Sequence, residues 1–228
     1  MGKQVTQRRF ANPVAVVLPL LGMAACASST PNPLAKVDDL VGWIERVHVE
    51  AELARQAAGT AVEKLQILTS PEFRGDPLVA YAEFTAAIDH SEQQAEALTA
   101  SIEPMKAAAG PVFDKWAATL ANFSNEQLRA RSESRFMFTR ESYEAVVAAV
   151  EPARDAYVQL NTTLRDHALF LGFDFNASAL GALQEDVAVL NHSASELDRW
   201  LDQSMVAARA YIESAALPMR VEAARAPR

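Results

Sequence analysis

The chain has 228 residues, a formal net charge of −8 and a single cysteine. This acidic balance argues against a nucleic-acid partner, because binding a phosphate backbone needs a basic face. One cysteine excludes a disulfide framework and a zinc site built from several cysteines. Ala, Glu, Leu and Arg dominate while glycine is scarce, which predicts an all-α protein.

Residues 1–25 resemble a secretory signal peptide. A basic start with three Lys or Arg residues precedes an apolar run that is too short to span a membrane. The run leads through Met23-Ala24-Ala25 into Cys26, which resembles the lipobox of bacterial lipoproteins with Met23 in place of the usual leucine. The resemblance implies that Cys26 becomes the first mature residue and carries acyl groups. We therefore expect an N-terminal lipid that anchors the protein in a bacterial cell envelope.

Other outcomes stay open for this segment. Signal peptidase could cut after Ala25-Cys26-Ala27, which has the A-x-A pattern, and so release a soluble periplasmic protein. Arg8-Arg9 is a weak likeness of a twin-arginine signal. In certain bacteria an aspartate after the lipidated cysteine favours retention in the inner membrane. Because Ala27 follows Cys26, the lipoprotein resemblance implies the periplasmic face of the outer membrane.

The mature chain divides into three parts. Cleavage before Cys26 would leave 18 basic and 29 acidic residues, a net charge of −11. Residues 26–36 are small, polar and interrupted by proline, which predicts a flexible linker that spans at most about 30 Å. Residues 37–216 are expected to form one helical bundle domain. Residues 217–228 form a basic tail.

Apolar residues recur at alternating steps of three and four along the whole predicted domain. An apolar repeat of 3.5 residues predicts long helices that lie nearly parallel and bury a narrow seam. We therefore expect an elongated, antiparallel four-helix bundle that resembles a coiled coil. Its seam segments are Val37–Leu68, Tyr81–Phe123, Phe136–Leu171 and Leu180–Ala215.

Local signals predict where the helices begin. Asp76 before Pro77 is a typical pair of N-cap and first-turn proline. Ser124 and Gln127 have the spacing of a capping box, in which each side chain bonds the other residue's backbone N–H. Asn176 can cap the fourth helix.

The connections between helices are short. Gly172 falls where the third helix needs a residue in the left-handed conformation at its C-terminus. The connections at residues 69–77, 123–126 and 171–176 leave no room for a long crossover, so neighbouring helices should run antiparallel.

Three prolines interrupt the predicted helices. Pro104, Pro111 and Pro152 each lack a backbone N–H, which costs about 3 kcal/mol in a straight helix. Gly110 before Pro111 weakens the second helix further. The apolar repeat keeps its phase across all three prolines, so we expect kinked helices. A break near residues 109–111 is the alternative.

The segments also carry motifs of a known family. These are Asp39-Leu40-Val41, Phe113-Asp114-Lys115-Trp116, Phe123-Ser124-Asn125-Glu126-Gln127-Leu128 and Asn176-Ala177-Ser178-Ala179-Leu180-Gly181-Ala182-Leu183-Gln184. In this order the motifs resemble an uncharacterised bacterial family of exported helical proteins, the domain of unknown function 2959. The resemblance spans residues 37–215 and implies an exported helical bundle. It offers no catalytic residue, and Pro111 departs from the family pattern, which puts the continuity of the second helix in doubt.

No pattern in the chain points to catalysis, a metal or a cofactor. Glu45 and His48 have the Glu-x-x-His spacing of half a di-iron site, but no other histidine has a glutamate three residues earlier. We therefore expect Glu45 and His48 on a solvated helix face. His167 lies on the seam, where a single histidine is typical of a register-setting residue. The sequence predicts a protein that is not an enzyme and binds no cofactor.

Antiparallel helices would gather arginines at one end of the bundle. If the first helix begins beside the anchor, then the turn at 123–126 and the C-terminus lie at that same end. Each basic residue near an anionic membrane adds about 1 kcal/mol of attraction. We expect a membrane-facing basic patch, with ordinary surface arginines as the alternative. Its members are Arg129, Arg131, Arg135, Arg140, Arg220, Arg225 and Arg228.

The opposite end carries three aromatic residues in its connections. Phe73, Phe173 and Phe175 are candidates for a patch that binds a partner protein. The alternative is that they cap the end of the core.

These features predict a structural or interaction module, a spacer or scaffold that presents helical surface to other envelope proteins. The alternative function is a periplasmic bundle that senses or binds a small ligand. We expect such a ligand between helices near Pro104, Pro111 and Pro152.

Overall fold

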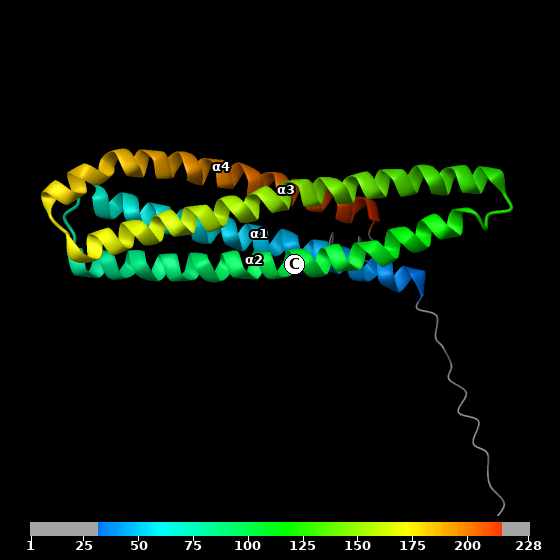
Figure 1. Cartoon of the computed structure of the whole chain (residues 1–228), viewed down its shortest axis with the longest axis horizontal. Helices are drawn as coiled ribbons and strands as arrows, with labels where there is room; N and C mark the ends of the chain where they lie inside the picture. The colour runs from blue at the N-terminus through cyan, green and yellow to red at the C-terminus, as the bar shows by residue number, and fades with distance from the viewer. Residues whose placement is uncertain (1–31, 216–228) are drawn as a thin grey trace, which may run out of the picture. The chain divides into compact units, whose positions relative to one another are not determined.

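The computed structural model describes residues 32–215, which form four long helices and contain no strand (Figure 1). The helices are α1 (Pro33–Thr69), α2 (Pro77–Leu120), α3 (Glu126–Phe173) and α4 (Ala177–Ala215). The predicted all-α fold is confirmed. The predictions for the signal peptide 1–25, for Cys26 and for the basic tail 217–228 lie outside the described residues.

Consecutive helices run antiparallel. α1 packs against α2 and α4, and α3 packs against the same two helices from the diagonal position. We call the end where α1 begins and α4 finishes the near end, and the end with the connections 70–76 and 174–176 the far end (Figure 1). At the near end α2 and α3 extend past the other two helices, so that their hairpin forms a protruding tip.

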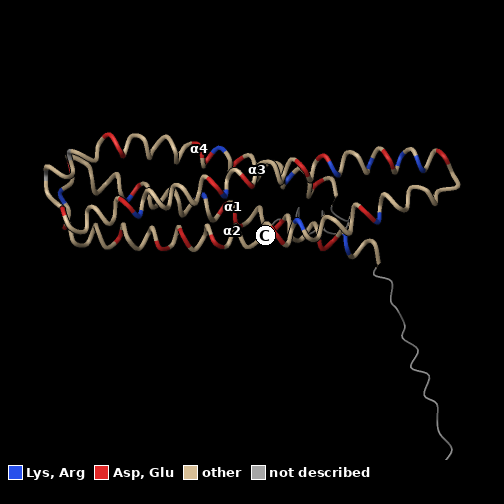
Figure 2. Tube along the Cα trace, in the orientation of Figure 1, with Lys and Arg blue, Asp and Glu red and all other residues tan. Residues whose placement is uncertain are grey.

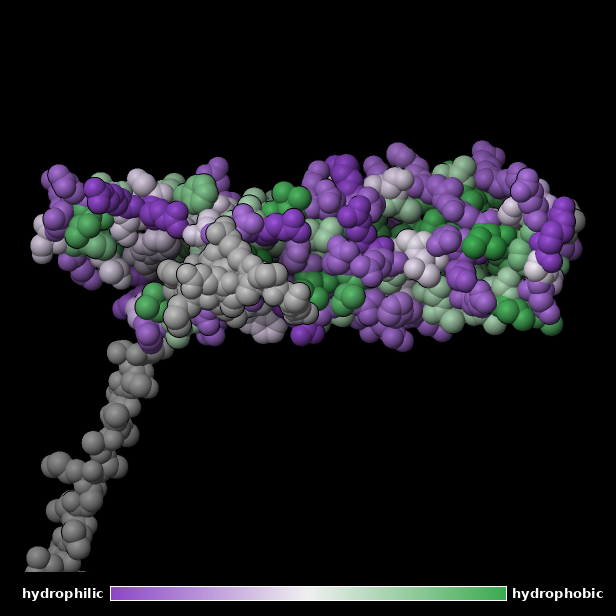
Figure 3. All heavy atoms as spheres, turned by 180° about the vertical axis from the view of Figure 1, so that it is seen from behind, coloured by the Kyte–Doolittle hydropathy of each residue, from purple (hydrophilic) through white to green (hydrophobic). Residues whose placement is uncertain are grey.

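The core follows the predicted seam. Every residue on the predicted seam is buried or half-buried, including Leu40 in α1 and Leu201 in α4. Phe84, Tyr157 and Tyr211 are among the largest side chains that are fully buried. Burying one large apolar side chain contributes about 1.5–3 kcal/mol, so this stripe is the main source of stability. Away from the core, apolar groups lie dispersed among hydrophilic ones on the face in Figure 3.

α1 begins earlier than predicted. Its N-cap is Asn32, whose side-chain oxygen accepts a hydrogen bond of 3.1 Å from the backbone N–H of Leu34. Pro33 then occupies the first helical position, where its fixed φ suits the helix. Residues 33–36, which were expected within the 26–36 linker, therefore form the first turn of the bundle.

The predicted N-caps of α2 and α4 are confirmed. The Asp76 carboxylate accepts a hydrogen bond of 2.8 Å from the N–H of Leu78. The side-chain oxygen of Asn176 accepts bonds of 3.0 Å from the N–H groups of Ser178 and Ala179.

The capping box predicted at Ser124 and Gln127 is wrong. The N-cap of α3 is Asn125, whose side chain accepts a hydrogen bond of 3.1 Å from the N–H of Leu128. Asparagine is as good an N-cap as serine. Capping one residue later also places Glu126 in the first turn, where its charge favours the positive end of the helix dipole.

The role predicted for Gly172 is also wrong. α3 continues through Gly172 to Phe173, and no residue in the described range 32–215 has a positive φ. Gly172 instead makes room for Tyr81 of α2. A Cβ atom at Gly172 would lie 2.7 Å from the Tyr81 hydroxyl oxygen, which donates a hydrogen bond of 2.9 Å to the carbonyl of Ala168.

The effect of Gly172→Ala on the free energy of unfolding should therefore depend on whether residue 81 is tyrosine or phenylalanine. In the wild-type background, alanine displaces the Tyr81 hydroxyl, and we expect the free energy of unfolding to fall by about 1 kcal/mol. In a Tyr81→Phe background the hydroxyl is absent. The better helix propensity of alanine should then raise the free energy of unfolding by about 0.5–1 kcal/mol. Urea unfolding of the four proteins measures both effects, and equal effects in the two backgrounds would contradict this packing.

The three internal prolines do not break the helices. α2 is one continuous helix through Pro104 and Pro111, and α3 is continuous through Pro152. The alternative of a break near residues 109–111 is therefore wrong. Figure 1 shows that α2 changes direction in its second half, as expected where prolines remove backbone hydrogen bonds.

Candidate functional site

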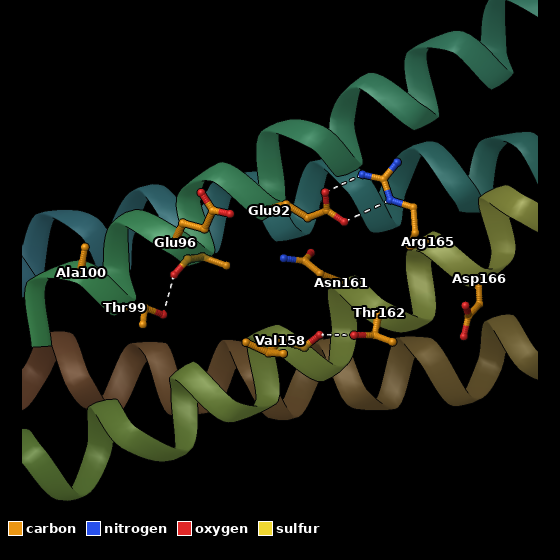
Figure 4. Close-up of a pocket in the computed structure, with 10 residues that line it drawn as sticks. Glu92, Glu96, Thr99, Ala100, Val158, Asn161, Thr162, Arg165 and Asp166 are labelled. Carbon is orange, nitrogen blue, oxygen red and sulfur yellow. Dashed lines mark hydrogen bonds and ion pairs between the residues drawn. The ribbon is translucent and has the colours of Figure 1, made fainter.

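A groove of about 660 Å³, the central groove, lies between α2 and α3 near the middle of the bundle (Figure 4). Ala95 and Ala100 of α2 and Val158 of α3 give it an apolar surface. Charged, hydroxyl and amide side chains surround that surface. These are Glu92, Glu96, Thr99, Asn161, Thr162, Arg165 and Asp166.

Arg165 ties the two walls of this groove together. Its guanidinium donates hydrogen bonds of 2.5 and 3.1 Å to the carboxylate of Glu92 and one of 2.7 Å to Asp89, one turn earlier in α2. Hydrogen bonding to Glu92, and then to Asp89, raises the pKa of Arg165. The pairs are partly exposed, so each contributes no more than about 1 kcal/mol. Because Arg165 is neutralised in this way, the remaining carboxylates make the groove acidic.

A buried polar cluster lies beside the central groove. The Ser91 hydroxyl is 2.7 Å from the side-chain oxygen of Asn161 and 3.1 Å from the Tyr157 hydroxyl. Burial raises the pKa of Tyr157 to about 12. Figure 4 shows the amide group of Asn161 at the centre of the groove. Asn161 does not lie on the predicted seam, so the apolar repeat does not indicate that it is buried.

A second groove, the near-end groove, has a volume of about 260 Å³. It lies between the first turn of α1 and the last turns of α2, and its surface is almost entirely apolar. Two lysines also line it. Its residues are Pro33, Leu34, Lys36, Val37, Pro111, Val112, Lys115, Trp116 and Thr119. This groove includes Pro111, one of three positions near which a ligand between helices was expected.

The four described arginines of the predicted basic patch lie in the first half of α3, where Figure 2 shows basic residues recurring along the helix. They are exposed but point to different sides. Arg135 donates a hydrogen bond of 2.9 Å to the carbonyl of Ser214 in α4. Arg140 pairs with Glu144 at 2.8 Å and lines a groove on the α2 side.

Arg129 lies 3.5 Å from Glu126, and Arg131 forms no ion pair with any residue in the range 32–215. Arg220, Arg225 and Arg228 lie outside the described residues. Contact of this end with a membrane stays a prediction.

The three phenylalanines predicted as a partner patch lie at the far end in different surroundings. Phe173, the last residue of α3, is 93% exposed, whereas Phe175 packs against the core. The ring of Phe73 folds over Gly75 in its own turn, within 2.9 Å of where a Cβ atom would lie. The part of the patch that is open to a partner is therefore Phe173.

Single substitutions should separate these two roles. Phe175→Ala removes a ring that packs on the core, so we expect the free energy of unfolding to fall by about 1–2 kcal/mol. Phe173→Ala should leave it within about 0.5 kcal/mol of wild type, because the ring is already in solvent. Chemical unfolding measures both, and a large loss for Phe173→Ala would mean that its ring packs against the protein in solution.

The histidines do not form a metal site. Within residues 32–215, no three His, Cys, Asp or Glu side chains come close enough to hold a metal ion. His48 is half-buried, not on a solvated face as expected, and its Nδ1 is buried without a hydrogen-bond partner in that range. His167 is buried on the seam as predicted, with its Nδ1 2.7 Å from the carbonyl of Thr163 in the preceding turn.

The family model of a protein of unknown function, DUF2959, matches residues 33–215. The chain belongs to this family. The match begins at the first residue of α1 and ends at the last residue of α4, so the DUF2959 domain coincides with the four-helix bundle. No curated protein sequence matches the chain significantly.

Two of the motifs that resemble the DUF2959 family have structural roles at the tip. Phe113 and Trp116 pack edge-on against Phe136 of α3, with ring centroids 6.1 and 5.7 Å apart, and such pairs contribute about 0.5–1.5 kcal/mol each. The indole N–H of Trp116 donates a hydrogen bond of 2.9 Å to Ser132. Asn125, from the next motif, caps α3. These motifs therefore hold the hairpin of α2 and α3 together.

None of the helices in the described range has a stretch both long and apolar enough to cross a membrane.

Proposed function

We propose that this DUF2959 protein is a lipid-anchored, non-enzymatic protein of the bacterial cell envelope that acts as a helical scaffold or spacer. The observation that carries the proposal is which helix ends lie together in the bundle. The start of α1, the tip of the α2–α3 hairpin and the end of α4 all lie at the near end.

This arrangement sets how far each end of the bundle would lie from the anchor. Cys26 and the five residues after it span at most about 20 Å, so an acylated Cys26 would hold the near end close to a lipid surface. α1 has 37 residues and is about 55 Å long, so the far end would stand well away from that surface. The exposed ring of Phe173 would then face other envelope components.

The anchor and the scaffold role need separate tests. Mass spectrometry of the mature N-terminus should find acyl groups on Cys26, and Cys26→Ser should move the protein from the membrane fraction to the soluble fraction. An unmodified, freely soluble N-terminus in the wild type would overturn the anchor.

For the scaffold role, a photo-crosslinker at Phe173 in intact cells should give discrete adducts with other envelope proteins. The same crosslinker at Val189, which is exposed on the side of α4, is the control. Identical adducts from the two positions, or none from Phe173, would remove the proposed role of the far end.

A second function is a bundle that binds a small ligand between its helices. The central and near-end grooves support it, and the near-end groove lies at Pro111, where a ligand was expected. A ligand present at about 100 times its Kd stabilises the folded state by about 2.7 kcal/mol. A thermal-shift screen of small molecules against the purified protein should therefore find a compound that raises the Tm, and a screen without any such compound would count against this function.

A further inference from the structure

We propose that the near-end groove binds the hydrocarbon chain of a long-chain fatty acid, whose carboxylate pairs with Lys36 and Lys115. This inference rests on the second function above, since it names the ligand class and the residues that would recognise it.

Two lysines at the near-end groove differ from the other lysines of the bundle. Residues 32–215 contain four lysines in a chain whose net charge is −8. Lys64 pairs with Glu83 at 2.6 Å, and Lys106 pairs with Glu151 at 2.9 Å. The other two, Lys36 and Lys115, form no ion pair within that range, and both line the near-end groove. The two uncompensated lysines are therefore brought together from α1 and α2 at one apolar groove, which suits a ligand with an anionic group.

The walls of the near-end groove suit a hydrocarbon chain. Leu34, Val112 and Trp116 present aliphatic and aromatic surface, and Leu34 is 56% exposed although it lies in the first turn of a core helix. Concave, mostly apolar sites with a few charged groups are typical of small-molecule binding. A hydrocarbon chain in the groove would remove this surface from water, which stabilises the complex by about 25 cal/mol for each Å² covered.

The two lysines and the size of the groove favour one class of lipid. Acyl groups on an acylated Cys26 carry no anionic group and would leave Lys36 and Lys115 uncompensated. A membrane phospholipid carries two chains, whereas this groove is a single site of about 260 Å³. A fatty acid has one chain and one carboxylate, and so matches both the apolar walls and the two lysines.

Trp116 provides a direct test because it lines the groove. The protein is the full chain with Cys26→Ser, so that it carries no acyl group, and the probe is 9,10-dibromostearic acid below its micelle concentration. Bromine quenches nearby tryptophan, so we expect saturable quenching that unbrominated stearate reverses. In Trp116→Phe, which leaves Trp43 and Trp200 as the reporters, the quenching should fall.

Charge variants complete the test. Lys36→Gln with Lys115→Gln should weaken stearate binding about tenfold, as expected for the loss of two ion pairs. The matched control Lys64→Gln with Lys106→Gln also removes two charges, but these lie outside the groove, and binding should stay at the wild-type level. Equal weakening in both double variants would mean that net charge, not the groove, attracts the fatty acid, and would overturn the proposal.

Other outcomes would overturn it as well. Undiminished quenching in Trp116→Phe would place the fatty acid elsewhere, and quenching by brominated phospholipid vesicles but not by the fatty acid would assign the groove to a membrane. The broader function fails separately. If a thermal-shift screen finds a ligand while dibromostearate leaves Trp116 unquenched, ligand binding by the bundle stands and the fatty-acid site is lost.

Discussion

Leu98→Ala is expected to lower the free energy of unfolding by about 2–5 kcal/mol. Leu98 is fully buried on the seam of α2, and the smaller side chain would lose apolar contacts and leave a cavity that long, close-packed helices cannot easily fill. Urea unfolding followed by circular dichroism measures the loss. We expect a lower midpoint with an unchanged slope, because the variant still unfolds from the same bundle.

Leu78→Ala is the matched control. It makes the same chemical change in the same helix, but Leu78 is 82% exposed in the first turn of α2. Its free energy of unfolding should stay within about 0.5 kcal/mol of wild type. If the two variants lost similar amounts, stability would not depend on the buried stripe, and the packing described for α2 would be wrong.

The stripe could be predicted because it is periodic. A 3.5-residue repeat constrains many positions at once, so one wrongly placed residue does not change the result. The repeat even continues across Pro104, Pro111 and Pro152, and the helices do the same. Polar residues that replace apolar ones on the seam, such as Ser91 and His167, are buried as the repeat requires.

Single positions at the helix ends were less predictable. Ser124 and Asn125 are adjacent residues with similar preference for the N-cap, and the sequence holds no signal that separates them. Gly172 has a structural reason that only the fold supplies. Its close neighbour is Tyr81, from a different helix and distant in the sequence. A glycine near a helix end predicts a left-handed residue, but it also permits a close approach.

The candidate sites also have features that the sequence predicts and features that depend on the fold. A ligand between helices was expected near Pro104, Pro111 and Pro152, and of these prolines Pro111 lines the near-end groove. That Lys36 and Lys115 both line this groove could not be predicted, because it depends on how α1 is placed against α2. Helical geometry does show that Arg129 and Arg131 point to different sides of α3, since two residues advance about 200° around a helix.

Tyr211→Phe is expected to raise the free energy of unfolding by about 1–2 kcal/mol. The Tyr211 side chain is fully buried in α4, and its hydroxyl has no hydrogen-bond partner in the described range. A buried polar group without a partner costs about 1–3 kcal/mol, so removing only the oxygen should stabilise the fold. For a chain of this size the Tm should rise by about 2–4 °C for each kcal/mol.

Tyr157→Phe is the control, and it should change the free energy of unfolding in the opposite direction. Tyr157 is equally buried, but its hydroxyl lies 3.1 Å from that of Ser91. Removing it breaks a hydrogen bond in the core, and we expect the free energy of unfolding to fall by about 1 kcal/mol. Destabilisation by both substitutions would show that the Tyr211 hydroxyl has a partner in solution, such as a bound water.

Alkaline unfolding gives an independent measure of the same tyrosines. Burial raises the pKa of Tyr157 to about 12 and also raises that of Tyr211, whereas an unfolded tyrosine ionises near pH 10. Between these values the folded state holds more protons than the unfolded state, so the free energy of unfolding must fall as the pH rises above about 10. Each phenylalanine variant removes one such group, so its free energy of unfolding should fall less steeply with pH than that of the wild type. An unchanged slope in Tyr211→Phe would mean that its hydroxyl is not buried.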